Sequence, residues 1–169
     1  MKSVYLLRHA KSDWDDASLA DIDRPLAERG RDAAPRMGQY MKAHQLIPDA
    51  VLVSGARRAI ETWDLVRPMF DEPRVRIERN LYMTTPDIML AWLRQLGDDV
   101  GAVMLIGHNP GFEELARRLA RDGRKKARKR LLRKYPTAGL AVLRFDVAGW
   151  TWVEWGGGYL EEFVRPKDL

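Results

Sequence analysis

Two histidines and three arginines lie where short apolar runs of this sequence end: Arg8-His9 after residues 4–7, Arg57-Arg58 shortly after residues 50–53, and His108 just after residues 102–106. Guanidinium groups bind the oxygens of a phosphate monoester in a bidentate manner. A neutral imidazole can attack phosphorus and form a covalent intermediate, which splits one difficult step into two. If folding brings these side chains together, they form a pocket suited to phosphoryl transfer, in which the protein mainly supplies positioning and charge.

The elements around these residues predict an α/β fold. Apolar runs typical of strands cover residues 4–7, 50–53, 75–77, 102–106, 140–145 and 151–155, and helical spacing covers residues 26–44, 57–70, 86–96 and 110–120. Continuous apolar strands that alternate with helices are typical of a mainly parallel sheet with helices on both faces. We therefore expect a three-layer sandwich. In such sheets ligands bind outside the carboxyl ends of the strands, where the histidines and arginines lie.

The sequence also predicts the structural role of a few single residues. Pro35 interrupts the helical pattern of residues 26–44, so we expect a kink there or a helix that begins near it. Trp63 and Trp92 lie on apolar helix faces and are expected in the core. Trp14 follows His9 closely and is expected at the mouth of the pocket.

The length and composition are typical of one domain over residues 1–169, with 46% apolar residues to form its core. The absence of cysteine excludes disulfides, thiolate catalysis and sulfur-ligated zinc. No signal peptide or membrane span is evident, so we expect a soluble cytoplasmic protein without a membrane partner. The acidic residues lack binding-loop spacing and the three histidines are scattered, so we expect no metal and no cofactor.

The positive charge is concentrated in residues 121–134. This segment holds nine Lys or Arg and one Asp, a net charge of +8, whereas the chain as a whole carries +5 and the remainder therefore −3. Three interpretations stay open: a solvated helix face or mobile insertion, a docking surface for an acidic protein, or contact with nucleic acid or anionic membrane. Few aromatic residues interleave the charges, so nucleic acid is disfavoured.

Three motifs resemble those of the histidine phosphatase superfamily, the group that includes the phosphoglycerate mutases. Leu7-Arg8-His9-Ala10 is similar to its Arg-His-Gly signature, residues 54–62 (SGARRAIET) to its Ser-x-x-x-Arg-Ala-x-x-Thr motif, and residues 106–111 (IGHNPG) to its motif with the second active-site histidine. The second motif selects Arg58 rather than Arg57 as the pocket arginine. The resemblance implies a phosphoglycerate mutase-like fold.

The short length, the Gly-His-Asn-Pro-Gly form and residues 136–138 (PTA) resemble the SixA-like phosphohistidine phosphatases within that superfamily. The resemblance implies that His9 attacks phosphorus and carries the phosphoryl group. It also implies that Arg8, Arg58 and His108 hold the phosphoryl oxygens, with His108 protonated in the complex. Ser12 either donates a further hydrogen bond to phosphate or bonds only within its loop.

The sequence departs from the family pattern in two places. Ala10 replaces the usual glycine, so the loop after His9 must adopt a conformation that alanine tolerates. Many members carry a glutamate proton donor where this chain has residues 80–83 (NLYM). Candidate substitutes, which the sequence does not rank, are Asp13, Asp15, Asp16, Asp21 and Asp23.

The missing glutamate bears on the substrate. An alkoxide leaving group needs a general acid, whereas imidazole, whose conjugate acid has a pKa of about 6.5, departs readily. The pocket therefore favours phosphohistidine on a protein, such as a phosphorelay or phosphotransferase component, over a sugar phosphate. The alternatives are a phosphatase or mutase for a small phosphorylated metabolite, and a non-catalytic adaptor that uses the basic segment.

Overall fold

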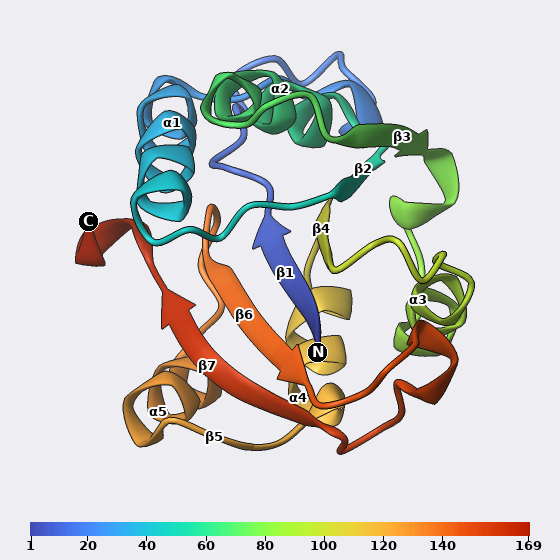
Figure 1. Ribbon diagram of the computed structural model, residues 1–169. Coiled ribbons are helices and arrows are strands. Elements are labelled where there is room, and N and C mark those ends of the chain that lie inside the picture. Colours follow the sequence, from blue (N-terminus) through green and yellow to red (C-terminus); the bar gives the residue numbers. More distant parts are fainter.

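A seven-stranded sheet forms the centre of the computed structural model, which describes residues 1–169 (Figure 1). Its strands are β1 (Lys2–Arg8), β2 (Ala50–Ser54), β3 (Arg74–Glu78), β4 (Ala102–Gly107), β5 (Ala120–Gly123), β6 (Leu140–Phe145) and β7 (Gly158–Val164). They lie in the order β3-β2-β4-β1-β6-β7-β5. β3, β2, β4 and β1 are parallel neighbours, as are β7 and β5, whereas β6 is antiparallel to both β1 and β7. The prediction of a mainly parallel sheet is confirmed.

Helices cover both faces of this sheet (Figure 1). The helices are α1 (Glu28–Ala43), α2 (Arg57–Val66), α3 (Pro86–Arg94), α4 (Gly111–Leu119) and α5 (Lys125–Arg133). α1 and α2 pack into one hydrophobic core, and α3, α4 and α5 pack into a second core on the opposite face. The three-layer sandwich is therefore confirmed. None of the helices combines the length and the apolar character that crossing a membrane would require.

The central strands contain unbroken apolar runs because both of their faces are buried. In β1, Val4 and Leu6 belong to the core under α3, α4 and α5, whereas Tyr5 and Leu7 belong to the core under α1 and α2. Successive side chains of a strand point to opposite faces, so a strand between two helical layers needs an unbroken apolar run. This constraint explains why the sequence pattern located β1, β2 and β4.

The predicted strand over residues 151–155 is wrong. Residues Trp150–Trp152 form a 3-10 helix, and the last strand follows at Gly158–Val164. Trp150 is fully buried and its indole N–H donates to the Val100 carbonyl at 2.7 Å, whereas Trp152 is exposed. In β7 the pairing with β6 shifts at Glu161, which has no partner in the ladder. This bulge lets Leu160 and Phe163 reach the same core at a spacing of three, so β7 lacks simple alternation.

Two further elements differ from expectation. α1 begins at Glu28 and continues through Pro35, so a helix start near that proline is wrong. Its buried face, which includes Ala34, Met37 and Met41, packs against the sheet and offsets the hydrogen bond that proline removes.

The basic segment is not an insertion: it forms β5 and α5, and α5 buries Ala127 and Leu131 in the core.

The topology brings the three motif-bearing strand ends to one edge of the sheet. β1, β2 and β4 are adjacent and parallel, with Arg8 opposite Gly107 and Val53 opposite Ile106. The backbone N–H of His9 extends the ladder by donating to the Gly107 carbonyl at 2.9 Å. The expectation that the strand ends converge is confirmed.

Gly30 in α1 controls how closely this helix approaches the loop after β1. A Cβ at this position would lie 2.2 Å from the Lys11 carbonyl oxygen and 2.9 Å from the Lys11 nitrogen. We predict that Gly30→Ala lowers the free energy of unfolding by about 1–3 kcal/mol in urea titrations, because backbone must move to accept the methyl group.

Gly38→Ala is the matched control in the same helix. The nearest atoms to a Cβ there would be Cγ of Met69 at 3.1 Å and Cβ and Cα of Val66 at 3.2 and 3.3 Å, so no atom comes as close as the Lys11 carbonyl oxygen does to Gly30. Alanine also adds up to about 1 kcal/mol of helix propensity. We expect a much smaller change for this variant. A Gly30→Ala protein as stable as wild type would contradict the close approach.

Candidate active site

A pocket of about 320 Å³ lies at the carboxyl ends of β1, β2 and β4. All five residues selected from the sequence line it: Arg8, His9, Ser12, Arg58 and His108. The remaining lining residues are Lys11, Trp14, Asp21, Tyr82, Met83, Asn109 and Thr137. The structure therefore brings the predicted residues together, and Trp14 lies at the pocket as expected.

His9 is held in one tautomer by its own loop. Its ring Nδ1 lies 2.7 Å from the carbonyl oxygen of Ala10. A carbonyl can only accept, so Nδ1 carries the proton and donates it to this bond. The other ring nitrogen, Nε2, then has an unshared electron pair. This is the form of imidazole that can act as a nucleophile.

The backbone around His9 is fixed from two sides. The amide of Ala10 donates to Thr62 Oγ1 at 3.0 Å, and this hydroxyl in turn donates to the Arg58 carbonyl at 2.7 Å. On the other side, the amide of Ala138 donates to the carbonyl oxygens of both Arg8 and His9. Ala10 is fully buried and has no positive φ, so alanine is accommodated where the family usually has glycine.

His108 faces His9 across the pocket, with ring centroids 5.1 Å apart. Its Nε2 lies 2.7 Å from Ser54 Oγ, and that oxygen also accepts from the amide of Ala56. The Ser54 hydroxyl can donate to neutral Nε2, which leaves the proton on Nδ1. Nδ1 is buried and has no hydrogen-bond partner within the protein. An anion in the pocket would supply the missing acceptor.

The two arginines are anchored by backbone carbonyls as well as by charge. Nη1 of Arg8 donates to the Tyr135 carbonyl at 2.8 Å, and its Nε is buried without a partner. Nη1 of Arg58 donates to the Asp21 carbonyl at 2.7 Å, while Nη2 donates to a carboxylate oxygen of Asp21 at 3.0 Å. Each guanidinium has five N–H donors, so both keep donors for a ligand.

Asp21 is the only carboxylate that lines the pocket. The hydroxyl of Tyr82 donates to it, and this bond together with the Arg58 guanidinium holds the pKa of Asp21 below its usual value. The other candidate acids lie elsewhere: Asp13, Asp15 and Asp16 surround a different depression, and Asp23 is exposed outside the pocket. The structure thus singles out one of five aspartates, and keeps it ionised.

Tyr82 is the main residue that sequence reasoning missed. It follows the 3-10 helix Arg79–Leu81, bonds Asp21, and presents its ring edge to His108 at 5.4 Å between centroids. It stands in the stretch where a family glutamate was sought. A search for any polar side chain at that place, rather than for a carboxylate, would have found it.

Burial and neighbouring cations hold both imidazoles neutral. Burial, with a smaller contribution from Arg58 and Arg8, lowers the pKa of His9 to about 4. Burial, then His9 and Arg58, lowers the pKa of His108 to about 3. Both rings are therefore uncharged near pH 7 in the empty pocket. An anion bound between them would favour the charged form of His108 again.

Two charged or titratable residues outside the pocket are exposed, and the two tryptophans expected in the core pack there. Arg57 is exposed and pairs with Glu61 at 3.5 Å, and His44 is exposed and stacks on Tyr40. Trp63 is buried and Trp92 packs against the core. No group of three or more His, Cys, Asp or Glu side chains is arranged to hold a metal ion.

Residues 4–82 match the family model of the histidine phosphatase superfamily, branch 1. An uncharacterized protein of Mycobacterium tuberculosis, Rv1276c, is 40% identical over 95% of this chain and 100% of its own length. The chain belongs to the histidine phosphatase superfamily. The matched region holds His9, Arg8 and Arg58, whereas His108 lies beyond it and is assigned by its position in the pocket.

Two solved structures assigned as the phosphohistidine phosphatase SixA share the fold over nearly the whole chain. The Agrobacterium tumefaciens protein is 27% identical, with a TM-score of 0.80 and coverage of 98% of both chains. The Nakamurella multipartitia protein is also 27% identical, with a TM-score of 0.83, over 98% of this chain and 96% of its own. The chain is thus SixA-like within the superfamily, and the phosphoglycerate mutase-like fold is confirmed.

The neutral histidines make stability depend on pH. In the unfolded chain a histidine takes up a proton near pH 6.5, whereas folded His9 stays neutral down to about pH 4. The unfolded state therefore binds more protons in this window, and stability falls as the pH falls. We predict that His9→Gln removes about 1.4 kcal/mol per pH unit from the slope of unfolding free energy between pH 6 and 5.

The measurement is a series of urea titrations of both proteins from pH 8 to pH 5. From pH 7 to 8 the slopes of the two proteins should coincide, because the histidine is neutral in both states there. Curves that run parallel down to pH 5 would show that folded His9 is protonated like an exposed imidazole.

Proposed function

We propose that this protein is a cytoplasmic, metal-independent phosphatase that removes the phosphoryl group from phosphohistidine on a protein, through a covalent intermediate on His9. The observation that carries the proposal is the tautomer of His9. With its Nδ1 proton bound to the Ala10 carbonyl, the electron pair on Nε2 is available in a pocket that also holds Arg8, Arg58 and His108.

In the first step Nε2 of His9 attacks phosphorus. A phosphorus–nitrogen bond to His9 forms while the bond from phosphorus to the substrate imidazole breaks. The departing nitrogen keeps the electron pair, and a proton on the other ring nitrogen of the substrate lets it leave as neutral imidazole. Arg8, Arg58 and His108 hold the phosphoryl oxygens, and Ser12, which is buried beside them, can add a hydrogen bond. Charge spread over these oxygens is met by guanidinium donors that are already in place.

In the second step water attacks the phosphoryl group on His9. The water oxygen bonds to phosphorus while the bond to Nε2 breaks, both water protons leave with the inorganic phosphate, and neutral His9 is restored with its proton on Nδ1. Phosphate charge beside His108 raises the pKa of that imidazole from its low resting value, so a protonated His108 can donate to a phosphoryl oxygen. Its unpartnered Nδ1 fits this role.

The state of Asp21 favours phosphohistidine over an alkyl phosphate. A general acid must carry a proton, yet Tyr82 and Arg58 keep Asp21 ionised, and no other carboxyl group lines the pocket. An imidazole leaving group, with a conjugate-acid pKa of about 6.5, needs little protonation to depart. The similarity to structures assigned as phosphohistidine phosphatases also supports this substrate class.

The nucleophile is tested by single-turnover labelling with a radiolabelled phosphohistidine protein. We predict acid-labile, base-stable label on the wild type and none on His9→Ala. The matched control is His44→Ala, which removes an exposed histidine far from the pocket residues and should label like the wild type. Label on His9→Ala would assign the nucleophile to another residue, and neither label nor phosphate release from the wild type would exclude this substrate class.

The leaving-group argument is tested with the same enzyme and two substrates. We predict that kcat/KM for a phosphohistidine peptide exceeds that for a simple alkyl phosphate by at least about 100-fold, the usual scale of general acid catalysis. Comparable values would mean that the pocket does protonate an alkoxide. That result would favour the alternative substrate class, a small phosphorylated metabolite.

A further inference from the structure

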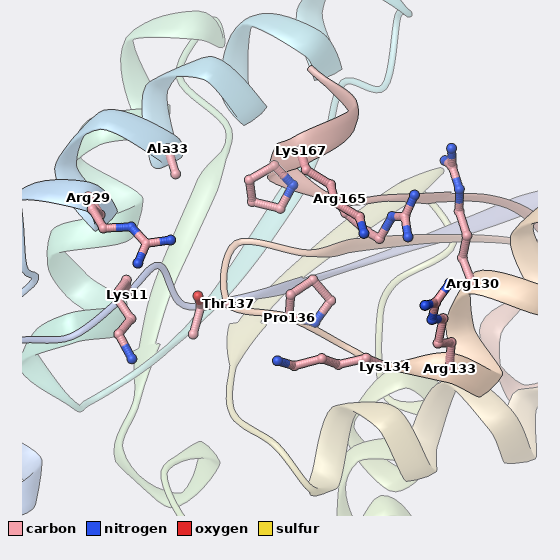
Figure 2. A pocket seen from close by; sticks show the side chains of 11 residues that line it. Lys11, Arg29, Ala33, Arg130, Arg133, Lys134, Pro136, Thr137, Arg165 and Lys167 are labelled. Carbon is pink, nitrogen blue, oxygen red and sulfur yellow. The ribbon is translucent and has the colours of Figure 1, made fainter.

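A groove of about 340 Å³ opens beside the catalytic pocket, and cations from four parts of the chain line it (Figure 2). We propose that this groove binds acidic side chains of the phosphorylated protein next to its phosphohistidine, an inference that rests on the proposed function. The cations used in the argument are Lys11 after β1, Arg29 of α1, Arg133 and Lys134 at the end of α5, and Arg165 and Lys167 after β7.

The groove carries positive charge that the protein itself leaves largely uncompensated. Seven of its eleven lining residues are Lys or Arg, and none is Asp or Glu. Asp168, which does not line the groove, pairs with Arg130 at 3.0 Å and Arg165 at 2.8 Å. The other five cations have no carboxylate within 4 Å. Like charges gathered around one hollow repel one another, so an acidic occupant is favoured there.

The groove and the catalytic pocket share a wall. Lys11 and Thr137 line both of them. Lys11 is two residues from His9, a separation of about 7 Å along extended backbone. A single extended peptide can therefore place its phosphohistidine against His9 and a neighbouring carboxylate against Lys11. In Figure 2 Arg29 and Lys134 lie on opposite sides of the groove, so such a segment would pass between them.

The positive surface extends further than a small metabolite would need. Exposed cations continue along α5 beyond the groove, over about 7 Å of helix: Lys125, Lys126, Arg128 and Lys129. No aromatic side chain lines the groove, so bases of a single-stranded nucleic acid would find nothing to stack on. The combination fits an acidic protein surface.

The test compares two phosphohistidine peptides of equal length, one flanked by Asp and Glu and the other by Asn and Gln. The groove variant is Arg29→Gln with Lys134→Gln, two exposed side chains without ion pairs from opposite walls. The matched control is Arg67→Gln with Lys42→Gln, which removes the same charges from exposed positions outside the groove. Binding of the unphosphorylated acidic peptide is measured in parallel by fluorescence anisotropy.

At low salt we expect the wild type to prefer the acidic peptide about tenfold in kcat/KM, mainly through KM, and to lose much of this preference in high salt. The groove variant should lose at least about fivefold of the preference and bind the acidic peptide correspondingly weaker, whereas the control variant keeps both. Equal losses in both variants, or no preference in the wild type, would overturn the inference. A single-stranded RNA that displaces the acidic peptide at lower concentration would assign the groove to nucleic acid instead.

The anisotropy measurement separates this inference from the proposed function. If neither peptide is hydrolysed but the acidic peptide binds through Arg29 and Lys134, the phosphohistidine substrate is wrong and the groove stands as an acidic docking site. If both peptides are hydrolysed equally and the acidic one does not bind, the proposed function stands and the docking inference fails.

Discussion

The hydrogen bond from His9 Nδ1 to the Ala10 carbonyl decides what this pocket can do, because it determines which ring nitrogen keeps an unshared electron pair. The bond forms only if the Ala10 peptide is held in one orientation. The peptide just before it, between His9 and Ala10, is held on both sides: Thr62 accepts from its N–H and the Ala138 amide donates to its carbonyl oxygen. α2 and the loop before β6 therefore act on the nucleophile through the backbone, and the close approach of Gly30 to Lys11 fixes the next residue of the same loop.

The protonation states of the two pocket histidines follow from their burial beside two arginines. Two imidazoles enclosed with two guanidiniums cannot both be charged without a counterion, and one ionised aspartate is all that the pocket provides. Both histidines therefore stay neutral near pH 7, which limits the positive charge of the pocket. A phosphoryl group brings the missing negative charge, so binding and the protonation of His108 are coupled. In the proposed mechanism one arrangement thus serves both a neutral nucleophile, His9, and a cationic oxygen-binding group, His108, whose ring centroids lie 5.1 Å apart.

Sequence reasoning succeeded where a local pattern reflects a physical constraint. β1, β2 and β4 are buried on both faces, which requires unbroken apolar runs, and their parallel order places His9, Ser54 and His108 at one edge. It failed where the constraint is nonlocal. The bulge at Glu161 breaks the alternation of β7, and residues 151–155, for which a strand was predicted, begin inside the 3-10 helix Trp150–Trp152. Asp21 and Tyr82 meet across 61 positions of sequence, so no spacing rule could have paired them.

The basic segment, residues 121–134, also shows that sequence alone does not predict where charge gathers on the folded protein. As a sequence it is a run of like charges, which most often forms a solvated face. In the fold only its last part reaches the groove, where it meets cations from α1, the β1 loop and the C-terminal residues. The positive groove is thus a property of the tertiary structure, assembled from four separate parts of the chain. Because Lys11 belongs to both the groove and the catalytic loop, a substrate bound through its acidic groups would be held beside the nucleophile, where orientation contributes most to the rate.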